Sequence, residues 1–387
     1  MMLNKKIFLV FFFAFLIRLI ALNQSLWLDE AVTANVVKNF RFLQIVSGFS
    51  PNDFHPPLYC LFIKLWTNVF GYSEVALRFP SIIFSLLAGY FVYKIASLFH
   101  DSIVAIWAAA FFLFNPLIVY YSQEARMYMM ATFLLTAGMY YLLKNKKLIL
   151  FNLFIILSFY TFYGSIFMIV SMYIYLLYKK QYKTFLVSCF IFLISFALIS
   201  SLLYQQFLHS KIALSTVTNW SLVLGKANIK NLLLIPIKFS VGRISFYPKW
   251  LYWGIAGVWT GFVYVSLIQK SKVKSLLFLL IFPLILGFIV SFFIPMLQYF
   301  RFIYLIPIMS LLLSRSNLRG WILTTGFLIF SLVYLLNPAF HREDWKSLVK
   351  SLPKGKPVYM ITASSDPVKY YSNGLRVIPL RSDFIGT

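Results

Sequence analysis

The stretch KKIFLVFFFAFLIRLIALNQSLWLDEAVTAN, residues 5–35, joins a long apolar run to two adjacent carboxylates, Asp29 and Glu30. The apolar part, about 6–23, is long enough to cross a bilayer, which takes about 20 residues of helix. Two lysines precede it and no small-x-small cleavage site follows it. We therefore interpret it as a retained first transmembrane helix, not a removed signal peptide, with the acid pair at its exit.

The composition extends this interpretation to the whole chain. Of 387 residues, 61% are hydrophobic and 12% are charged, and the mean hydropathy is +0.82. Soluble domains contain about 25% charged residues. Repeated apolar runs of about 18 or more residues predict an all-α polytopic membrane protein. Cys60 and Cys189 lie far apart in apolar segments without metal-ligand spacing, so a disulfide framework is not expected.

The net charge of +25 does not indicate nucleic acid binding, because the basic residues gather in short breaks between apolar runs. Short cytoplasmic loops carry such an excess under the positive-inside rule, and membrane lipids are the expected partner of this charge. The clusters are Lys144, Lys146 and Lys147; Lys179, Lys180 and Lys183; Lys270, Lys272 and Lys274; and Arg315 and Arg319.

The basic clusters predict about eleven spans with the N-terminus inside. The first three spans are expected at about 6–23, 77–99 and 102–121, and a fourth returns to Lys144. Two short helices within 148–178 turn at Gly164. The last five spans are expected at about 184–207, 251–269, 275–296, 302–314 and 320–337. An outer segment at 24–76 and a polar, basic outer loop at 208–250 interrupt them. Residues 1–338 would thus form a transmembrane catalytic domain.

Residues 339–387 lack a membrane-length apolar run and are expected to form a small outer α/β domain. A helix is predicted at 343–352, a strand in KPVYMIT, a helix at 366–373 and a second strand in LRVIPL. About 50 residues bury little core alone, so this part is expected to pack on the outer loops.

The acidic residues, which were not used to build the topology, fall on its outer side. Only Asp101 is expected inside. The outer acids are Asp29, Glu30, Asp53, Glu74, Glu124, Glu343, Asp344, Asp366 and Asp383. Acids contribute little to topology selection, so this asymmetry is not forced by insertion.

Asp29 and Glu30 allow two interpretations. They can stabilise the start of a helix, EAVTANVVKNF, as first-turn or capping acids. A carboxylate at the membrane surface can also lose solvent and act as a general base toward an acceptor hydroxyl. Both interpretations can hold together.

Two further outer segments carry candidate residues. His55 precedes two prolines that suit the first turn of a helix, LYCLFIKLW, lying along the membrane surface. It can be a metal ligand, an acceptor contact or an ordinary surface histidine. In YSQEARMY, Glu124 and Arg126 occupy a short turn at membrane depth, where charges are costly unless paired or functional. They form either a local ion pair or a site in which Arg126 binds phosphate and Glu124 binds a proton, metal or sugar.

Arg78 and Arg301 are expected on the same side at similar depth. With the lysines and Arg243 of the 208–250 loop they form an outer basic surface, which can hold the phosphate or pyrophosphate head of a lipid or simply be solvated. The aromatic residues Trp27, Tyr121 and Tyr128 are expected on the same rim.

This rim suits an enzyme that draws a lipid-linked substrate from the bilayer. A transporter is less well supported, since no acid or base is expected in mid-span as in ion relays. A flippase or exporter of lipid-linked sugars and a non-catalytic subunit of an envelope-glycan complex remain the alternatives.

The motifs LWLDEA, HPPLY, EVALRFPS, YSQEARMY, FRFIYLIP and REDWKSL occur in the order and spacing of a superfamily of membrane glycosyltransferases. Over about residues 5–375 the chain resembles the GT-C-fold group that includes protein O-mannosyltransferases and the aminoarabinose transferases of lipid A. The first four motifs together are specific to the superfamily but say little about the substrate.

The resemblance implies a polyprenyl-phosphate-sugar donor, a glycan, lipid or protein acceptor on the outer face of the plasma (inner) membrane, and inversion at the anomeric carbon. It implies that Asp29 is the catalytic base, that Glu30 shapes the acceptor side and that Arg126 holds the donor phosphate, a fixed cation for a leaving group whose charge grows. Arg78 and Arg301 are further phosphate candidates. Glu124, His55 and Tyr128 are candidates for sugar, acceptor or divalent-metal contacts. The outer C-terminal domain is short for the group.

Overall fold

The computed structural model describes residues 2–216, 219–268, 274–314, 317–353, 355–361, 364–372 and 376–380. Lys270, Lys272 and Arg315, which entered the predicted topology, and Asp383, which was expected on its outer side, lie outside the described residues.

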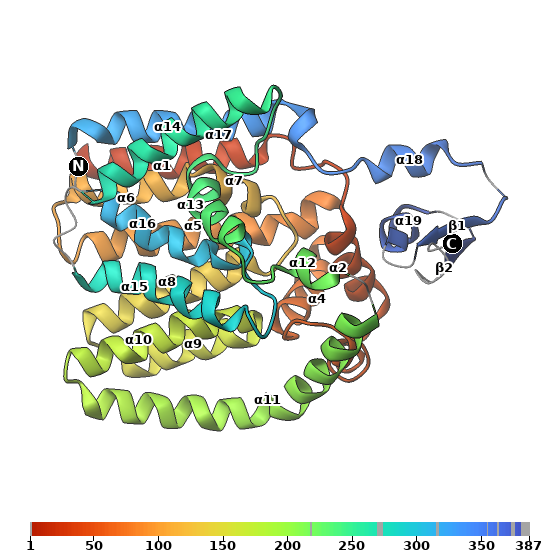
Figure 1. The fold of residues 1–387 in the computed structure, drawn as a ribbon, viewed down its shortest axis with the longest axis horizontal. Helices are drawn as coiled ribbons and strands as arrows, with labels where there is room; N and C mark the ends of the chain where they lie inside the picture. Colours follow the sequence, from red (N-terminus) through yellow and green to blue (C-terminus); the bar gives the residue numbers. More distant parts are fainter. Residues whose placement is uncertain are drawn as a thin grey trace.

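The described chain is mostly helical, which confirms the predicted fold class, and its long helices run side by side (Figure 1). The short helices α2 (Leu28–Asn39), α4 (Leu58–Phe70) and α12 (Trp220–Leu224) and the C-terminal elements gather at the end opposite the N-terminus. The bundle helices are α1 (Met2–Leu19), α5 (Glu74–Ala96), α6 (Ser102–Leu113), α7 (Pro116–Ser122), α8 (Tyr128–Lys144), α9 (Leu148–Thr161), α10 (Ile166–Tyr178), α11 (Tyr182–Thr216), α13 (Ile229–Val241), α14 (Lys249–Ile268), α15 (Lys274–Val290), α16 (Ile306–Leu313) and α17 (Asn317–Leu336).

Few of these helices are individually long and apolar enough to span a membrane. Among the described residues, α5 and α11 pass this test, and α6 with α7 makes a third if the bent pair counts as one span. Six further apolar helices have 10–17 residues. The count of eleven spans therefore stays a prediction.

The predicted third span, 102–121, is wrong as a single helix. It bends by 59° between α6 and α7. Asn115 caps the second piece by accepting from the backbone N–H groups of Leu117 and Ile118, and its amide donates to the Phe239 carbonyl at 2.7 Å. Pro116 has no N–H for the continuing helix, so the chain restarts here.

The first helix ends at Leu19, earlier than predicted, which places Arg18 in its last turn. This side chain is buried and donates to the hydroxyl of Ser85 and to the carbonyls of Ala14 and Leu113. It therefore ties α1 to α5 and to the end of α6.

The predicted polar loop at 208–250 is also wrong in part. Helix α11 extends to Thr216, and α13 packs into the bundle with Ile235, Phe239 and Val241 buried. The predicted helix at 302–314 begins with a 3-10 turn, η4 (Tyr299–Leu305), before α16.

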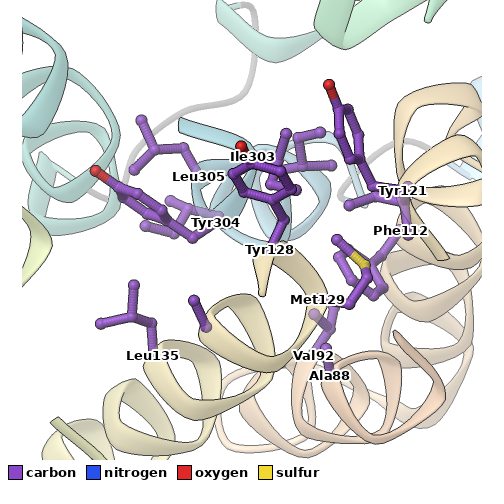
Figure 2. Close-up of a cluster of buried hydrophobic side chains, with 14 of the residues drawn as sticks. Ala88, Val92, Phe112, Tyr121, Tyr128, Met129, Leu135, Ile303, Tyr304 and Leu305 are labelled. Carbon is purple, nitrogen blue, oxygen red and sulfur yellow. The ribbon is translucent and has the colours of Figure 1, made fainter. Parts of the chain in front are cut away.

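The core lies between α5, α6, α8 and η4 (Figure 2). Gly89 of α5 permits their close approach, because a Cβ there would lie 2.6 Å from Leu113. Tyr121 and Tyr128 stack edge to face at 5.2 Å between ring centroids, next to η4 (Figure 2). These two tyrosines join the core to the rim of the bundle that carries the short helices.

The C-terminal part contains the predicted elements. They are α18 (Trp345–Ser351), β1 (Val358–Ile361), α19 (Ser365–Tyr371) and β2 (Val377–Leu380), and the two strands pair in parallel with Val358 opposite Val377. The βαβ unit docks on the outer segment, where the Tyr371 hydroxyl accepts from the Leu26 N–H at 2.8 Å. Helix α18, which precedes this unit, adds a contact between the Lys346 amine and the Glu74 carboxylate at 2.7 Å.

Candidate functional site

The two adjacent acids sit in the first turn of α2. The helix begins two residues earlier than predicted, with Trp27 at its N-cap. Carboxylates in this turn interact favourably with the helix dipole. Their side chains then diverge: that of Asp29 is 46% exposed and that of Glu30 is 1% exposed.

Glu30 forms a buried ion pair with Arg78. The Arg78 guanidinium donates to both Glu30 oxygens, at 2.8 and 2.6 Å. Its remaining donors bind the carbonyls of Leu22, Gln24 and Ser25. All five donors of the side chain are thereby used, so Arg78 has none left for a phosphate.

The Glu30 carboxylate also accepts from the N–H of Ala125 at 2.7 Å. Its oxygens are occupied and shielded from solvent, which does not fit the predicted catalytic role. Through these contacts, Glu30 and Arg78 hold the start of α2 against α5 and against the turn that carries Arg126.

Arg126 lies next to Asp29 but is loosely held. Its Nη2 is 3.5 Å from an Asp29 carboxylate oxygen, and its Nη1 donates to the Asp29 carbonyl at 3.4 Å. Its Nε is buried and has no hydrogen-bond partner. A buried donor without a partner is costly, so this guanidinium keeps capacity for an anion.

Arg301 belongs to the same group of charges. Its side chain interacts electrostatically with Asp29, Arg126 and Tyr128. Only its Nη1 has protein partners in the described chain, the carbonyls of Leu224 and Pro295. Arg301 therefore offers further donors beside Arg126, in contrast to Arg78.

Tyr128 forms the apolar wall of this site. Its ring packs edge to face on Tyr121 and on Phe300, and its hydroxyl makes no hydrogen bond within the described residues. The hydroxyl is free for a substrate or water.

Asp53 and His55 form a second pair near Arg126, with Nδ1 and Oδ1 3.5 Å apart. Burial alone would raise the pKa of Asp53, but the charges of His55 and Arg126 and a hydrogen bond from His55 outweigh it and lower that pKa. His55, a candidate site residue from the sequence, thus contacts Asp53, for which the sequence indicated no role. On the next helix, burial and the charge of Asp53 raise the pKa of the Cys60 thiol to about 12.

A protein-ligated divalent metal does not fit the donor set. No three His, Cys, Asp or Glu side chains of the described chain come together in a group that could hold a metal ion. Asp29 is paired with a guanidinium, and Glu124 with another.

Glu124 pairs with Arg342 and not with Arg126, so the local ion pair, one of the two alternatives for this turn, is not formed. Its carboxylate accepts from Arg342 at 2.7 Å, and the Arg342 guanidinium stacks on Trp27 at 3.6 Å from the ring centroid. The partner comes from the REDWKSL motif, 218 residues along the chain. The motif was visible in the sequence, but its contact with Glu124 was not.

A further cation, Arg243, follows α13. It donates to the Tyr120 hydroxyl at 2.6 Å and lies over that ring. The basic loop thus places Arg243 near Glu124, whereas the sequence distinguished no member of this loop.

Residues 54–204 match the family model described as dolichyl-phosphate-mannose-protein mannosyltransferase. This match contains HPPLY, EVALRFPS and YSQEARMY but lies after Asp29. No curated protein matches the chain.

Solved structures of low sequence identity share its fold. ArnT from Cupriavidus metallidurans in the apo state is 11% identical with a TM-score of 0.64, over 97% of this chain and 86% of that one. The same protein bound to undecaprenyl phosphate is 12% identical with a TM-score of 0.62, over 99% and 86%. The Archaeoglobus fulgidus oligosaccharyltransferase in complex with Zn and sulfate is 14% identical with a TM-score of 0.53, over 97% and 62%. These likenesses confirm the resemblance to GT-C glycosyltransferases at the level of the fold.

Proposed function

We propose that this chain, which has the GT-C fold of membrane glycosyltransferases, transfers a sugar from a polyprenyl-phosphate donor to an acceptor hydroxyl. The site would lie on the extracytoplasmic face of the plasma membrane, as the basic clusters predict. One observation carries the proposal: a half-exposed carboxylate, Asp29, lies 3.5 Å from a guanidinium, Arg126, that has unused donors. A base and an anion site are thus adjacent.

The proposed reaction is a single displacement. Asp29 takes the proton from the acceptor hydroxyl, whose oxygen forms a bond to the anomeric carbon as the bond from that carbon to the phosphate oxygen breaks. The electron pair leaves with the polyprenyl phosphate, and attack opposite the leaving group inverts the anomeric carbon.

The positive charges on the site have the matching role. Negative charge grows on the phosphate as the sugar departs. A fixed cation therefore attracts the phosphate more strongly in the transition state than in the ground state, and this lowers the barrier. Arg126 and Arg301 have donors available for this purpose. Arg243 supplies a further cation near Glu124. Glu30 and Arg78 keep the turn that carries Arg126 in place.

The donor class draws support from two sources. The family model on residues 54–204 describes an enzyme of dolichyl-phosphate-mannose, and the ArnT structure of similar fold binds undecaprenyl phosphate. Both are isoprenoid phosphates. The sugar and the acceptor are left open by these names.

The test uses purified protein with radiolabelled undecaprenyl- and dolichyl-phosphate sugars and extracted cell-envelope acceptors. The expected result is a labelled acceptor of inverted anomeric configuration together with free polyprenyl phosphate. Movement of the intact donor across liposome membranes, without any labelled acceptor, would instead establish the flippase alternative and exclude this proposal.

A further inference from the structure

We infer that the cavity between α2 and the C-terminal βαβ unit binds a sugar unit of the acceptor, which makes the acceptor a glycan or a glycan-bearing molecule. The identification of this sugar as part of the acceptor rests on the proposed function, but the binding of the sugar does not require catalysis. The cavity measures about 380 Å³, within the range of small-ligand sites.

The lining of the cavity matches the surface of a sugar ring. Asn35, Asn39 and Asp366 bring amide and carboxylate groups, which together donate to and accept from hydroxyls. Phe40 and Phe49 also line the cavity, with ring centroids 6.3 Å apart. Their faces suit the C–H face of a pyranose, as aromatic rings pack on apolar surface while the polar groups fix orientation.

Two of these polar groups are already held in place. The Asn35 amide donates to both the carbonyl and the carboxylate of Asp366 at 3.0 Å, which links α2 to α19 across the cavity. The Asn35 amide oxygen and the second carboxylate oxygen of Asp366 have no protein partner within the described chain. Asn39 makes no side-chain hydrogen bond there either, so acceptors and donors remain available for a ligand.

The cavity lies along the same helix as the proposed base. Val32, Asn35 and Asn39 line it, and they follow Asp29 by three, six and ten residues. With 3.6 residues per turn, the lining residues of α2 point about a quarter turn away from Asp29. At 1.5 Å per residue, Asn39 lies about 15 Å along the axis from Asp29. An acceptor glycan of more than one unit can therefore occupy the cavity and present a hydroxyl to Asp29.

The charges on the cavity rim favour an acidic glycan. Lys38 and Lys369 are exposed on either side of it, from α2 and α19. The single carboxylate of the lining, Asp366, is engaged by Asn35. The net positive rim attracts a sugar that carries carboxylate or phosphate groups.

The inference is tested by binding of the detergent-solubilised full chain to a panel of immobilised neutral and acidic oligosaccharides. We expect acidic members to bind, and Asn39→Ala and Phe40→Ala each to weaken that binding at least tenfold. Matched controls are Asn68→Ala and Phe70→Ala, which alter an exposed asparagine and an exposed phenylalanine of α4 outside the cavity. The controls should bind as the unmodified protein does.

Retained affinity for undecaprenyl phosphate shows that the Asn39 and Phe40 variants are folded. Asp29→Asn should slow transfer by about 10²- to 10⁴-fold without changing glycan binding, so failure of the proposed function can be told apart from failure of this inference. Absence of binding to every acidic oligosaccharide, or equal binding by the variants and the unmodified protein, would overturn the inference.

Discussion

The replacement Glu30→Gln probes the buried ion pair that supports the site. The glutamine has nearly the same shape, but it removes the negative charge and turns an N–H₂ group toward donors that now lie 2.6 to 2.8 Å from the carboxylate. Arg78 would keep its three carbonyl acceptors and lose its only counter-ion. Breaking a buried pair by removing one partner costs about 3–5 kcal/mol.

This cost corresponds to a decrease of about 10²- to 10⁴-fold in the ratio of folded to unfolded protein, at about 1.4 kcal/mol for each factor of ten. The assay is unfolding of the detergent-solubilised protein by increasing SDS mole fraction, followed by tryptophan fluorescence. Glu343→Gln is the matched control, because this exposed acid makes no ion pair within the described chain and its replacement should change stability by less than about 0.5 kcal/mol.

A second variant separates charge from packing. If the penalty comes from the unpaired guanidinium, Glu30→Gln combined with Arg78→Met should be more stable than the sum of the two single effects predicts. A Glu30→Gln protein within about 1 kcal/mol of the unmodified one would refute the reasoning, since it would mean that solvent or another acid compensates Arg78.

Three further outcomes follow from the geometry of the site. Arg126→Met should weaken binding of polyprenyl phosphate about 10- to 100-fold, as expected for a charged hydrogen bond, whereas Arg41→Met, on an exposed arginine of the same outer segment, should not, as measured by equilibrium binding. Because the pKa of Asp53 is lowered in the folded protein, its contribution to stability is present above the unfolded pKa of about 3.9 and is lost as the pH falls through the folded value. The difference in thermal midpoint between the unmodified protein and Asp53→Asn should therefore shrink as the pH falls below about 5 and vanish at lower pH. Glu124→Gln should unpair Arg342 and speed hydrogen exchange in α18 while leaving exchange in α9 unchanged.

Hydrophobic patterning was sufficient to predict most of the helices, because an apolar run of sufficient length forms a helix of its own. The patterning failed where tertiary contacts determine whether a segment is helical or where a helix breaks. The break at Asn115 depends on a proline and on a carbonyl from α13, and the local sequence does not report the second of these. The sequence predicts a polar loop in place of α13 because Lys230 and Lys238 interrupt an apolar stretch, although Ile235 and Phe239 are buried in the bundle.

The candidate site was predictable in its location and not in its pairings. Asp29 and Arg126 stand in short motifs whose position between predicted spans places them on one rim. The partner of Glu30 lies 48 residues away, and that of Glu124 lies 218 residues away. No local pattern reports such contacts, so the sequence predicts a phosphate contact for Arg78 and indicates no role for Arg342. The same limit applies to the cavity between α2 and α19, whose walls are brought together only by the fold.

The central claim is that Asp29 removes the acceptor proton while the cations beside it hold the phosphate. It is tested most directly by measuring, on the same preparation of Asp29→Asn, the single-turnover rate of sugar transfer and the equilibrium affinity for the polyprenyl-phosphate donor. The account predicts a rate lower by about 10²- to 10⁴-fold, the usual contribution of a general base, with the affinity changed less than about threefold. Transfer by Asp29→Asn at a rate within tenfold of the unmodified protein would contradict it.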